Sequence, residues 1–351
     1  MDNSSLIAPN LFEQVDLKDS LFELLYSAVP PGSRPKRDAT PNPAETKIYS
    51  LEEIGQLVQT NSWATVVLAT RESISLMKDQ EIGSILKYWT LRITSLVQLR
   101  KFYSANKEIC NLEDSYRQWF FMNKVSGKSS NWITFWPFEL CILRANLPYY
   151  AEEDIDTSIN RICELISLCE EGNWVFVENV NNFLKETVIK KRSIQLSINL
   201  AGLLLNENCG FISKSHELFS KVRGLEGQSE LDNMNWAFYY VAIGDWKQAK
   251  EAFEGIARSS ESGTNYAAAN NAAVCGFYLG NVPLMLQDLD KIMQEMPSIA
   301  GTDETLVFNY CSAVELACGG SWQRSLKVKK VIDVGQWAGD GFDIKVFKFS
   351  G

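Results

Sequence analysis

Three glycine turns, each flanked by similar apolar residues, constrain the fold of this 351-residue chain more than any other feature. They lie at Gly210, Gly244 and Gly280, which are 34 and 36 residues apart. A period of this length with a turn in its middle is typical of a pair of antiparallel helices. One such pair cannot bury its apolar faces alone, so the period predicts an array of stacked helix pairs.

The residue types at fixed positions of this period fit the tetratricopeptide repeat, a helix–turn–helix unit of 34 residues. A small residue at position 8 lets the two helices approach closely, and a glycine at position 15 supplies the positive φ of the turn. The residue at position 20 packs on the first helix, and position 24 fills the space to the next repeat. The residues expected in this packing signature are Ala237, Gly244, Ala249, Phe253, Ala273, Gly280, Leu289 and Pro297.

Helical spacing of apolar residues continues from about residue 50 to the last dozen residues, without a competing strand pattern. The predicted fold is all-α, a right-handed tetratricopeptide-like α-solenoid of about six or seven helix pairs. Six of the ten prolines lie in the first 43 residues. We therefore expect a flexible arm over 1–46, in which Leu21–Leu25 forms a short amphipathic helix that docks on its own domain or on a partner. The repeat domain is expected over 47–335, and a C-terminal arm over 336–351.

Composition excludes several classes of protein. The formal charge of −9 argues against binding to nucleic acid, which requires clustered lysine and arginine. No run of about 18 apolar residues is present to span a membrane, and the N-terminus carries no basic and apolar leader pattern. None of the eight cysteines forms a C-x-x-C pair, which favours free structural thiols in a reducing compartment.

The sequence shows no constellation of residues for catalysis, for a metal or for a cofactor. His216 is the only histidine, which weakens every mechanism that depends on an imidazole. No phosphate-binding glycine loop of the G-x-x-x-x-G-K-[ST] type occurs. We expect a binding protein that is not an enzyme. The alternative, an enzyme with an unrecognised site, would lose turnover on mutation of His216 or of a carboxylate pair.

Tetratricopeptide arrays usually bind partners on the concave face that their first helices line. The residues expected there are Leu231, Met234, Phe238, Val241, Asn270, Val274 and Phe277. This lining is mostly apolar, which disfavours a clamp for a terminal carboxylate. The residues either pack on the neighbouring helix or form an apolar groove for a partner helix. The chain's own segment Leu21–Leu25 is one candidate to fill such a groove.

A second candidate surface lies in an aromatic-rich region. Aromatic residues on both sides of a polar loop at 124–130 include Phe121, Trp132 and Trp136. Many rings in this region must be core, because exposing all of them would favour aggregation. The few at the rim are candidates to anchor a partner.

Several stretches match one family in order. The segment from Asn270 to Asn309 contains N-N-A-A-V-C, Y-L-G, a proline and F-N, and further matches lie at 89–105, 136–145 and 342–349. They resemble the subunit 12 family of TRAPP, a vesicle-tethering complex whose core activates Rab GTPases. The resemblance covers roughly 58–350. Residues 171–195 match the family poorly. The chain also lacks the long N-terminal extension of larger members, so the functions of that extension are not carried over.

The resemblance implies a non-catalytic scaffold subunit in ER–Golgi and Golgi vesicle-mediated transport. It implies other TRAPP subunits as partners and a Rab GTPase as an indirect one. It also implies a cytoplasmic location, with peripheral association at Golgi and ER–Golgi membranes through the complex. The alternative is a generic tetratricopeptide adaptor that binds a client helix or peptide in its apolar concave groove.

Overall fold

The computed structural model describes most of the chain. The described residues are 3–15, 17, 19–36, 46–78, 81–122, 131–172, 182–205, 210–226, 230–259 and 265–349. Within these ranges every regular element is a helix, so the all-α prediction is confirmed. The chain divides into two compact units. Unit 1 comprises Met1–Leu17 and Thr40–Leu203, and unit 2 comprises Lys18–Ala39 and Leu204–Gly351.

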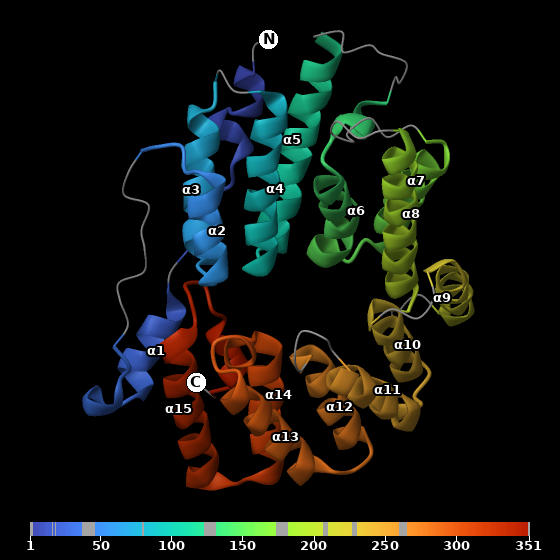
Figure 1. The fold of residues 1–351 in the computed structure, drawn as a ribbon. Helices are drawn as coiled ribbons and strands as arrows, with labels where there is room; N and C mark the ends of the chain where they lie inside the picture. Colours follow the sequence, from blue (N-terminus) through green and yellow to red (C-terminus); the bar gives the residue numbers. More distant parts are fainter. Residues whose placement is uncertain are drawn as a thin grey trace. The chain divides into compact units, whose positions relative to one another are not determined.

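In unit 1, helices that are neighbours in sequence pack on each other from α2 to α7 (Figure 1). The elements of this unit are η1 (Ser4–Leu6), η2 (Pro9–Leu11), α2 (Leu51–Gln59), α3 (Trp63–Leu76), α4 (Ile82–Gln98), α5 (Phe102–Met122), η4 (Trp132–Phe135), α6 (Phe138–Glu152), α7 (Ile155–Glu170) and α8 (Asn182–Leu204).

Local capping explains where helix α2 begins. The Ser50 hydroxyl accepts a hydrogen bond from the Glu53 backbone N–H, and the Glu53 carboxylate accepts one from the Ser50 backbone N–H at 2.7 Å. This reciprocal capping box satisfies backbone donors that the first turn of a helix leaves open.

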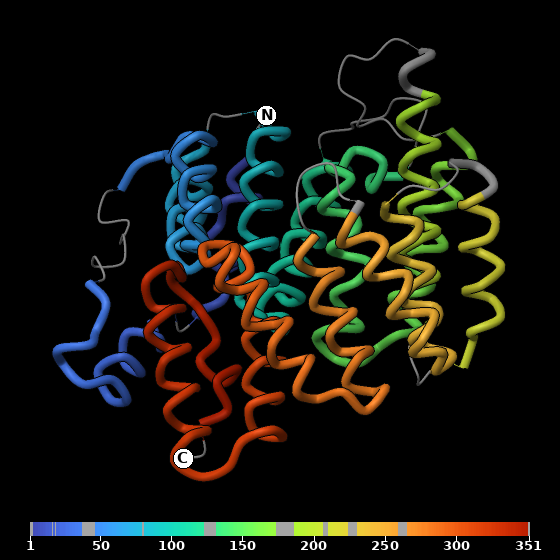
Figure 2. The backbone as a smooth tube through the Cα atoms, turned by 60° about the horizontal axis from the view of Figure 1, so that its bottom comes forward, coloured from blue at the N-terminus to red at the C-terminus, as the bar shows by residue number. Residues whose placement is uncertain are grey.

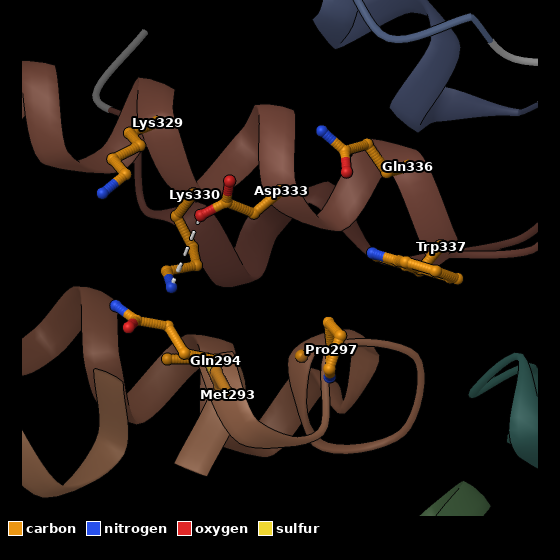
Figure 3. A pocket seen from close by; sticks show the side chains of 9 residues that line it. Met293, Gln294, Pro297, Lys329, Lys330, Asp333, Gln336 and Trp337 are labelled. Atoms are coloured by element: carbon orange, nitrogen blue, oxygen red, sulfur yellow. Dashed lines mark ion pairs between the residues drawn. The ribbon is translucent and has the colours of Figure 1, made fainter. Parts of the chain in front are cut away.

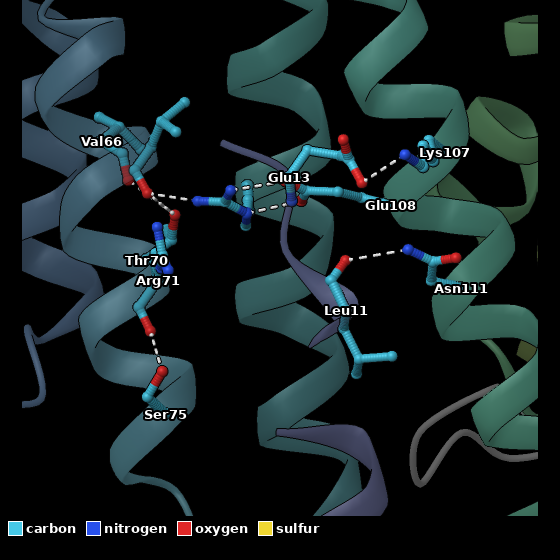
Figure 4. A network of polar contacts seen from close by, with 11 residues as sticks. Leu11, Glu13, Val66, Thr70, Arg71, Ser75, Lys107, Glu108 and Asn111 are labelled. Atoms are coloured by element: carbon cyan, nitrogen blue, oxygen red, sulfur yellow. Dashed lines mark hydrogen bonds and ion pairs between the residues drawn. The ribbon is translucent and has the colours of Figure 1, made fainter. Parts of the chain in front are cut away.

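The N-terminal segment is packed on α4 and α5, although the sequence predicts an arm here (Figure 4). The indole of Trp89 donates a hydrogen bond to the Leu6 carbonyl at 3.0 Å. The Phe12 ring stacks on Trp89, with 4.8 Å between the ring centroids. The backbone N–H of Glu13 donates to the Glu108 carboxylate at 2.9 Å. These contacts bury the apolar residues of the segment and satisfy part of its backbone.

Two buried ion pairs fix α5 between its neighbours. Arg92 of α4 and Arg144 of α6 each form a forked pair with a glutamate of α5, Glu108 and Glu113 respectively. All four side chains are at most 9% exposed. Such pairs fix the geometry of a core, because removing one partner leaves the other charge buried.

Unit 2 contains the blue helix near residues 20–28 and the helices that run from yellow to red in Figure 2. From α9 to α15, each helix packs on the next one along the chain. The elements are α1 (Ser20–Ala28), η3 (Pro31–Ser33), α9 (Ile212–Glu226), α10 (Glu230–Ala242), α11 (Trp246–Ser259), α12 (Tyr266–Tyr278), α13 (Val282–Glu295), η5 (Ala300–Thr302), α14 (Glu304–Ala317), α15 (Gly320–Trp337) and η6 (Ile344–Phe347).

The repeat glycines adopt the backbone conformation expected of them. Gly244 has φ 77° and Gly280 has φ 90°. At the end of α10, Gly244 N–H donates to the Val241 carbonyl at 3.0 Å and Asp245 N–H to the Tyr240 carbonyl at 2.9 Å. This is a Schellman motif, in which a residue with positive φ ends the helix and satisfies its last carbonyls.

Most of the predicted packing signature lies in the core of unit 2. The buried members are Ala237, Ala249, Phe253, Ala273 and Leu289. Pro297 is exposed and follows the end of α13 at Glu295. The small residues let α11 pack closely on both α10 and α12.

Both terminal segments of unit 2 are packed as well. Leu21 and Leu25 of α1 are buried, and α1 contacts α15 and η6. The Leu21–Leu25 segment is therefore engaged away from the face of α10 and α12 that it was a candidate to fill. In the predicted C-terminal arm, Phe342, Val346 and Phe347 are buried, and η6 packs on α14.

Candidate partner-binding surfaces

Helix α10 presents the first part of the predicted concave face. Leu231 and Phe238 are 57% and 44% exposed, and they are seven positions apart, so they lie on one side of the helix. Met234 and Val241 lie on the same side and are half-buried against the core. The result is an apolar stripe along α10 that is partly open.

The Phe238 side chain is held in place by a ring of the core. Its ring packs edge-on against Phe253 of α11, with 5.4 Å between centroids and 74° between planes. Phe253 itself is fully buried. An aromatic side chain that is half-exposed and already ordered can bury further area in a partner at little entropic cost.

The α12 part of the predicted face is more closely packed. Val274 and Phe277 are half-buried and contact the core of unit 2. Asn270 is only 3% exposed, because its amide links two helices: Asn309 of α14 donates to the Asn270 oxygen at 2.9 Å. The Asn270 amide in turn donates to Asn271. Asn270 therefore holds α12 to α14 and is not accessible to a partner.

Of the three candidate aromatic residues, only Phe121 is on the surface, at 65% exposed. Trp136 is fully buried and Trp132 is 9% exposed, and their rings meet edge-on at 5.2 Å. The Arg117 guanidinium lies 4.7 Å from the Trp132 ring centroid, which completes the packing of this ring. Both tryptophans belong to the core of unit 1. The polar loop at 124–130 lies outside the described residues.

The structure places His216 among aromatic rings. Its imidazole lies 5.2 Å from the ring centroids of Trp236 and Tyr239. Among the described residues, no group of three His, Cys, Asp or Glu side chains is arranged to hold a metal ion. None of the described helices is both long and apolar enough to cross a membrane.

A cleft of about 460 Å³ lies between α13 and α15 (Figure 3). Lys330 of α15 occupies its wall and is buried. The Lys330 ammonium pairs with Asp290 of α13 at 3.0 Å and with Asp333 of its own helix at 3.7 Å. Lys330 thus joins the two helices through its pair with Asp290.

Sequence reasoning missed the ion pairs that join neighbouring helices. The partners in Arg92–Glu108 and Lys330–Asp290 are 16 and 40 residues apart. The sequence does contain one feature that indicates such a buried pair: a charged residue at a helix position whose neighbours three and four residues away are apolar.

No protein-family model matches the chain. It is 26% identical over 325 residues to trafficking protein particle complex subunit 12 of Mus musculus, which covers 76% of this chain and 39% of that protein. It is 22% identical over 416 residues to the Homo sapiens protein of the same name, covering 100% of this chain and 55% of that protein. The predicted resemblance to the subunit 12 family is confirmed. The chain spans 39–55% of the length of these relatives.

The stretches that suggested the subunit 12 resemblance largely build the core. Trp89 and Arg92 hold the N-terminal segment and α5, and Arg144 holds α6 to α5. Asn270 and Asn309 join α12 to α14. These stretches thus contain residues that determine how the helices pack.

Proposed function

We propose that this chain is a non-catalytic scaffold subunit of a trafficking protein particle complex. The observation that carries the proposal is similarity to subunit 12 along the whole chain, because chance similarity in one repeat would not extend through both units. The activity of the relatives as whole proteins is transferred only as part of this proposal.

In this function the chain is a right-handed solenoid of the tetratricopeptide type that binds other subunits of the complex. A Rab GTPase is an indirect partner, which the core of the complex engages. The protein acts in the cytoplasm, and it associates peripherally with Golgi and ER–Golgi membranes through the complex. Helical arrays suit this function because they expose extended surfaces without requiring any reactive group.

The α10 stripe supplies the contact that we assign to a neighbouring subunit. Leu231 and Phe238 are its exposed members. Aromatic anchors that become fully desolvated carry a large share of the binding energy in protein interfaces. The partner surface is an apolar helix face or pocket that receives the Phe238 ring.

The experiment is affinity purification of the tagged chain at its natural level, followed by mass spectrometry. The proposal predicts recovery of several complex subunits in comparable amounts. Phe238→Ser should lower their recovery about tenfold, and Ile243→Ser should leave it unchanged. Ile243 is the matched control, because it is 46% exposed in the same repeat against 44% for Phe238. Recovery of the chain without any subunit would overturn the proposal.

The open apolar stripe also favours a second candidate, an adaptor that binds one client helix on its own. That function predicts that the isolated chain binds an amphipathic peptide tightly and that Phe238→Ser abolishes this binding. It further predicts a single co-purifying client in place of a set of subunits.

A further inference from the structure

A second groove lies in unit 2, on the side of α12 where α11 and α13 run. It has a volume of about 750 Å³. Its floor is formed largely by alanines, Ala269, Ala272 and Ala273, and its walls carry charged side chains from α11 and α13. A floor of small residues lets the backbone of another helix approach closely.

The charged residues of the walls pair along their own helices. On α11, Glu254 pairs with Lys250 at 3.5 Å and with Arg258 at 3.4 Å. On α13, Lys291 pairs with Glu295 at 3.9 Å. Within the described part of the chain, no ion pair crosses this groove. The walls are therefore not joined, and the alanine floor stays open.

Asp288 is the charged residue of the groove that lacks a partner. It is half-buried on α13, and among the described residues it makes neither an ion pair nor a hydrogen bond. Burial raises the pKa of this carboxyl, while the Lys250 charge opposes that rise. Removing a carboxylate from water without a compensating hydrogen bond costs free energy, so a donor placed here would be bound favourably.

The adjacent groove shows how the same helix satisfies such a carboxylate. Asp290, two residues further along α13, pairs with the buried Lys330 of α15 at 3.0 Å. There a lysine of the chain itself reaches across and joins the two helices. On the α11 side of α13, no described lysine forms an ion pair with Asp288, although the charges of Lys250 and Lys291 oppose the rise in its pKa.

We propose that the groove between α11 and α13 is a docking site for an amphipathic helix of another protein, which lays small and apolar residues on the alanine floor and directs one lysine or arginine at Asp288. The charge of the unpaired carboxylate selects a basic residue and disfavours an acidic one. The surface is distinct from the α10 stripe, so the chain can engage two partners at once.

The test uses the full chain and a defined probe, a display library of helical 16-residue peptides with one randomised face. Binders are selected on the natural chain and compared on Asp288→Asn, which keeps the shape of the side chain and removes its charge. The expected peptides share a lysine or arginine beside an apolar face, and they bind Asp288→Asn about tenfold more weakly or worse. Glu251→Gln, an exposed position of α11, is the matched control and should not change their affinity.

The second part of the test exchanges the charges of the peptide's basic residue and of Asp288. A selected peptide with its basic residue changed to glutamate should lose binding to the natural chain and regain it on Asp288→Lys. Asp288→Asn should fold with unchanged or higher stability, because the carboxylate has no partner to lose. The proposal is overturned if no peptide is selected, if the selected peptides bind Asp288→Asn equally well, or if charge exchange restores nothing. Since the library contains no complex subunit, this outcome is separate from the test of the proposed function.

Discussion

Arg92 and Glu108 join α4 to α5 through two hydrogen bonds of 2.6 Å between fully buried side chains. A third guanidinium donor reaches the Val67 carbonyl of α3 at 2.7 Å. The same Glu108 carboxylate accepts the backbone N–H of Glu13 (Figure 4). One ion pair thus connects three helices and the N-terminal segment.

Arg92→Met should destabilise unit 1 by about 3–5 kcal/mol, because it leaves the Glu108 charge buried without its partner. Lys107→Met is the control: Lys107 pairs with Glu13 at 3.0 Å, but its side chain is 49% exposed. Exposed pairs of this kind contribute about 1 kcal/mol or less. Chemical denaturation of both variants measures the difference. Equal losses in the two variants would contradict the role given to the buried pair.

The turn at Gly244 should not tolerate a side chain. Gly244→Ala is expected to lower the free energy of unfolding by about 1–2 kcal/mol, since φ there is 77° and the left-handed region is unfavourable for alanine. Gly255→Ala is the matched change in the exposed helical part of α11, where open space surrounds the glycine. That variant should gain about 0.5–1 kcal/mol. Thermal melting of both should therefore show shifts of opposite sign.

The capping box of α2 should lose part of its effect in acid. Hydrogen bonds from Lys47 and Ser50 to the charged form lower the pKa of Glu53 to about 2. A carboxyl whose folded pKa is depressed stabilises the fold above its unfolded pKa of about 4.3, and this contribution fades as pH falls toward 2. The melting temperature of Glu53→Gln should lie below that of the natural chain at pH 7, and the gap should narrow below pH 4.5. A gap that is constant from pH 7 to 3 would contradict this assignment.

The cysteines should differ in reactivity according to burial. Cys163 is exposed, whereas Cys141 and Cys311 are buried. Burial raises the pKa of the Cys311 thiol to about 12, so almost no thiolate forms there at pH 8. In a Cys209→Ser background, a thiol reagent should label Cys163 first and Cys141 and Cys311 only on unfolding. If Cys163→Ser leaves the initial labelling rate unchanged, the assignment is wrong.

The sequence predicted the helical array and its best-defined turns, because Gly244 and Gly280 must supply a positive φ that other residues rarely adopt. It did not predict that Asn61 and Arg100 end α2 and α4 with the same conformation, at φ 54° in both cases. Neither residue type marks a turn as clearly as glycine does. The sequence therefore indicated the turns at the glycines more clearly than the turns at Asn61 and Arg100.

The candidate surface was predictable only in part. Helical spacing places Leu231 and Phe238 on one side of α10, because period alone determines which residues share a face. It could not show that the Asn270 side chain is engaged in a hydrogen bond with Asn309, since that contact depends on how α14 packs against α12. The unpaired state of Asp288 depends likewise on side chains of another helix, and no pattern within α13 reveals it.

The most direct test of the central claim is the size at which the natural chain elutes from a cell extract, followed together with other subunits of the trafficking protein particle complex. The account predicts that most of the chain elutes with those subunits, far above its own 39.6 kDa, and that depleting one of them shifts it to a smaller size. Elution of the chain as a free 39.6 kDa protein, unaffected by their depletion, would contradict the account.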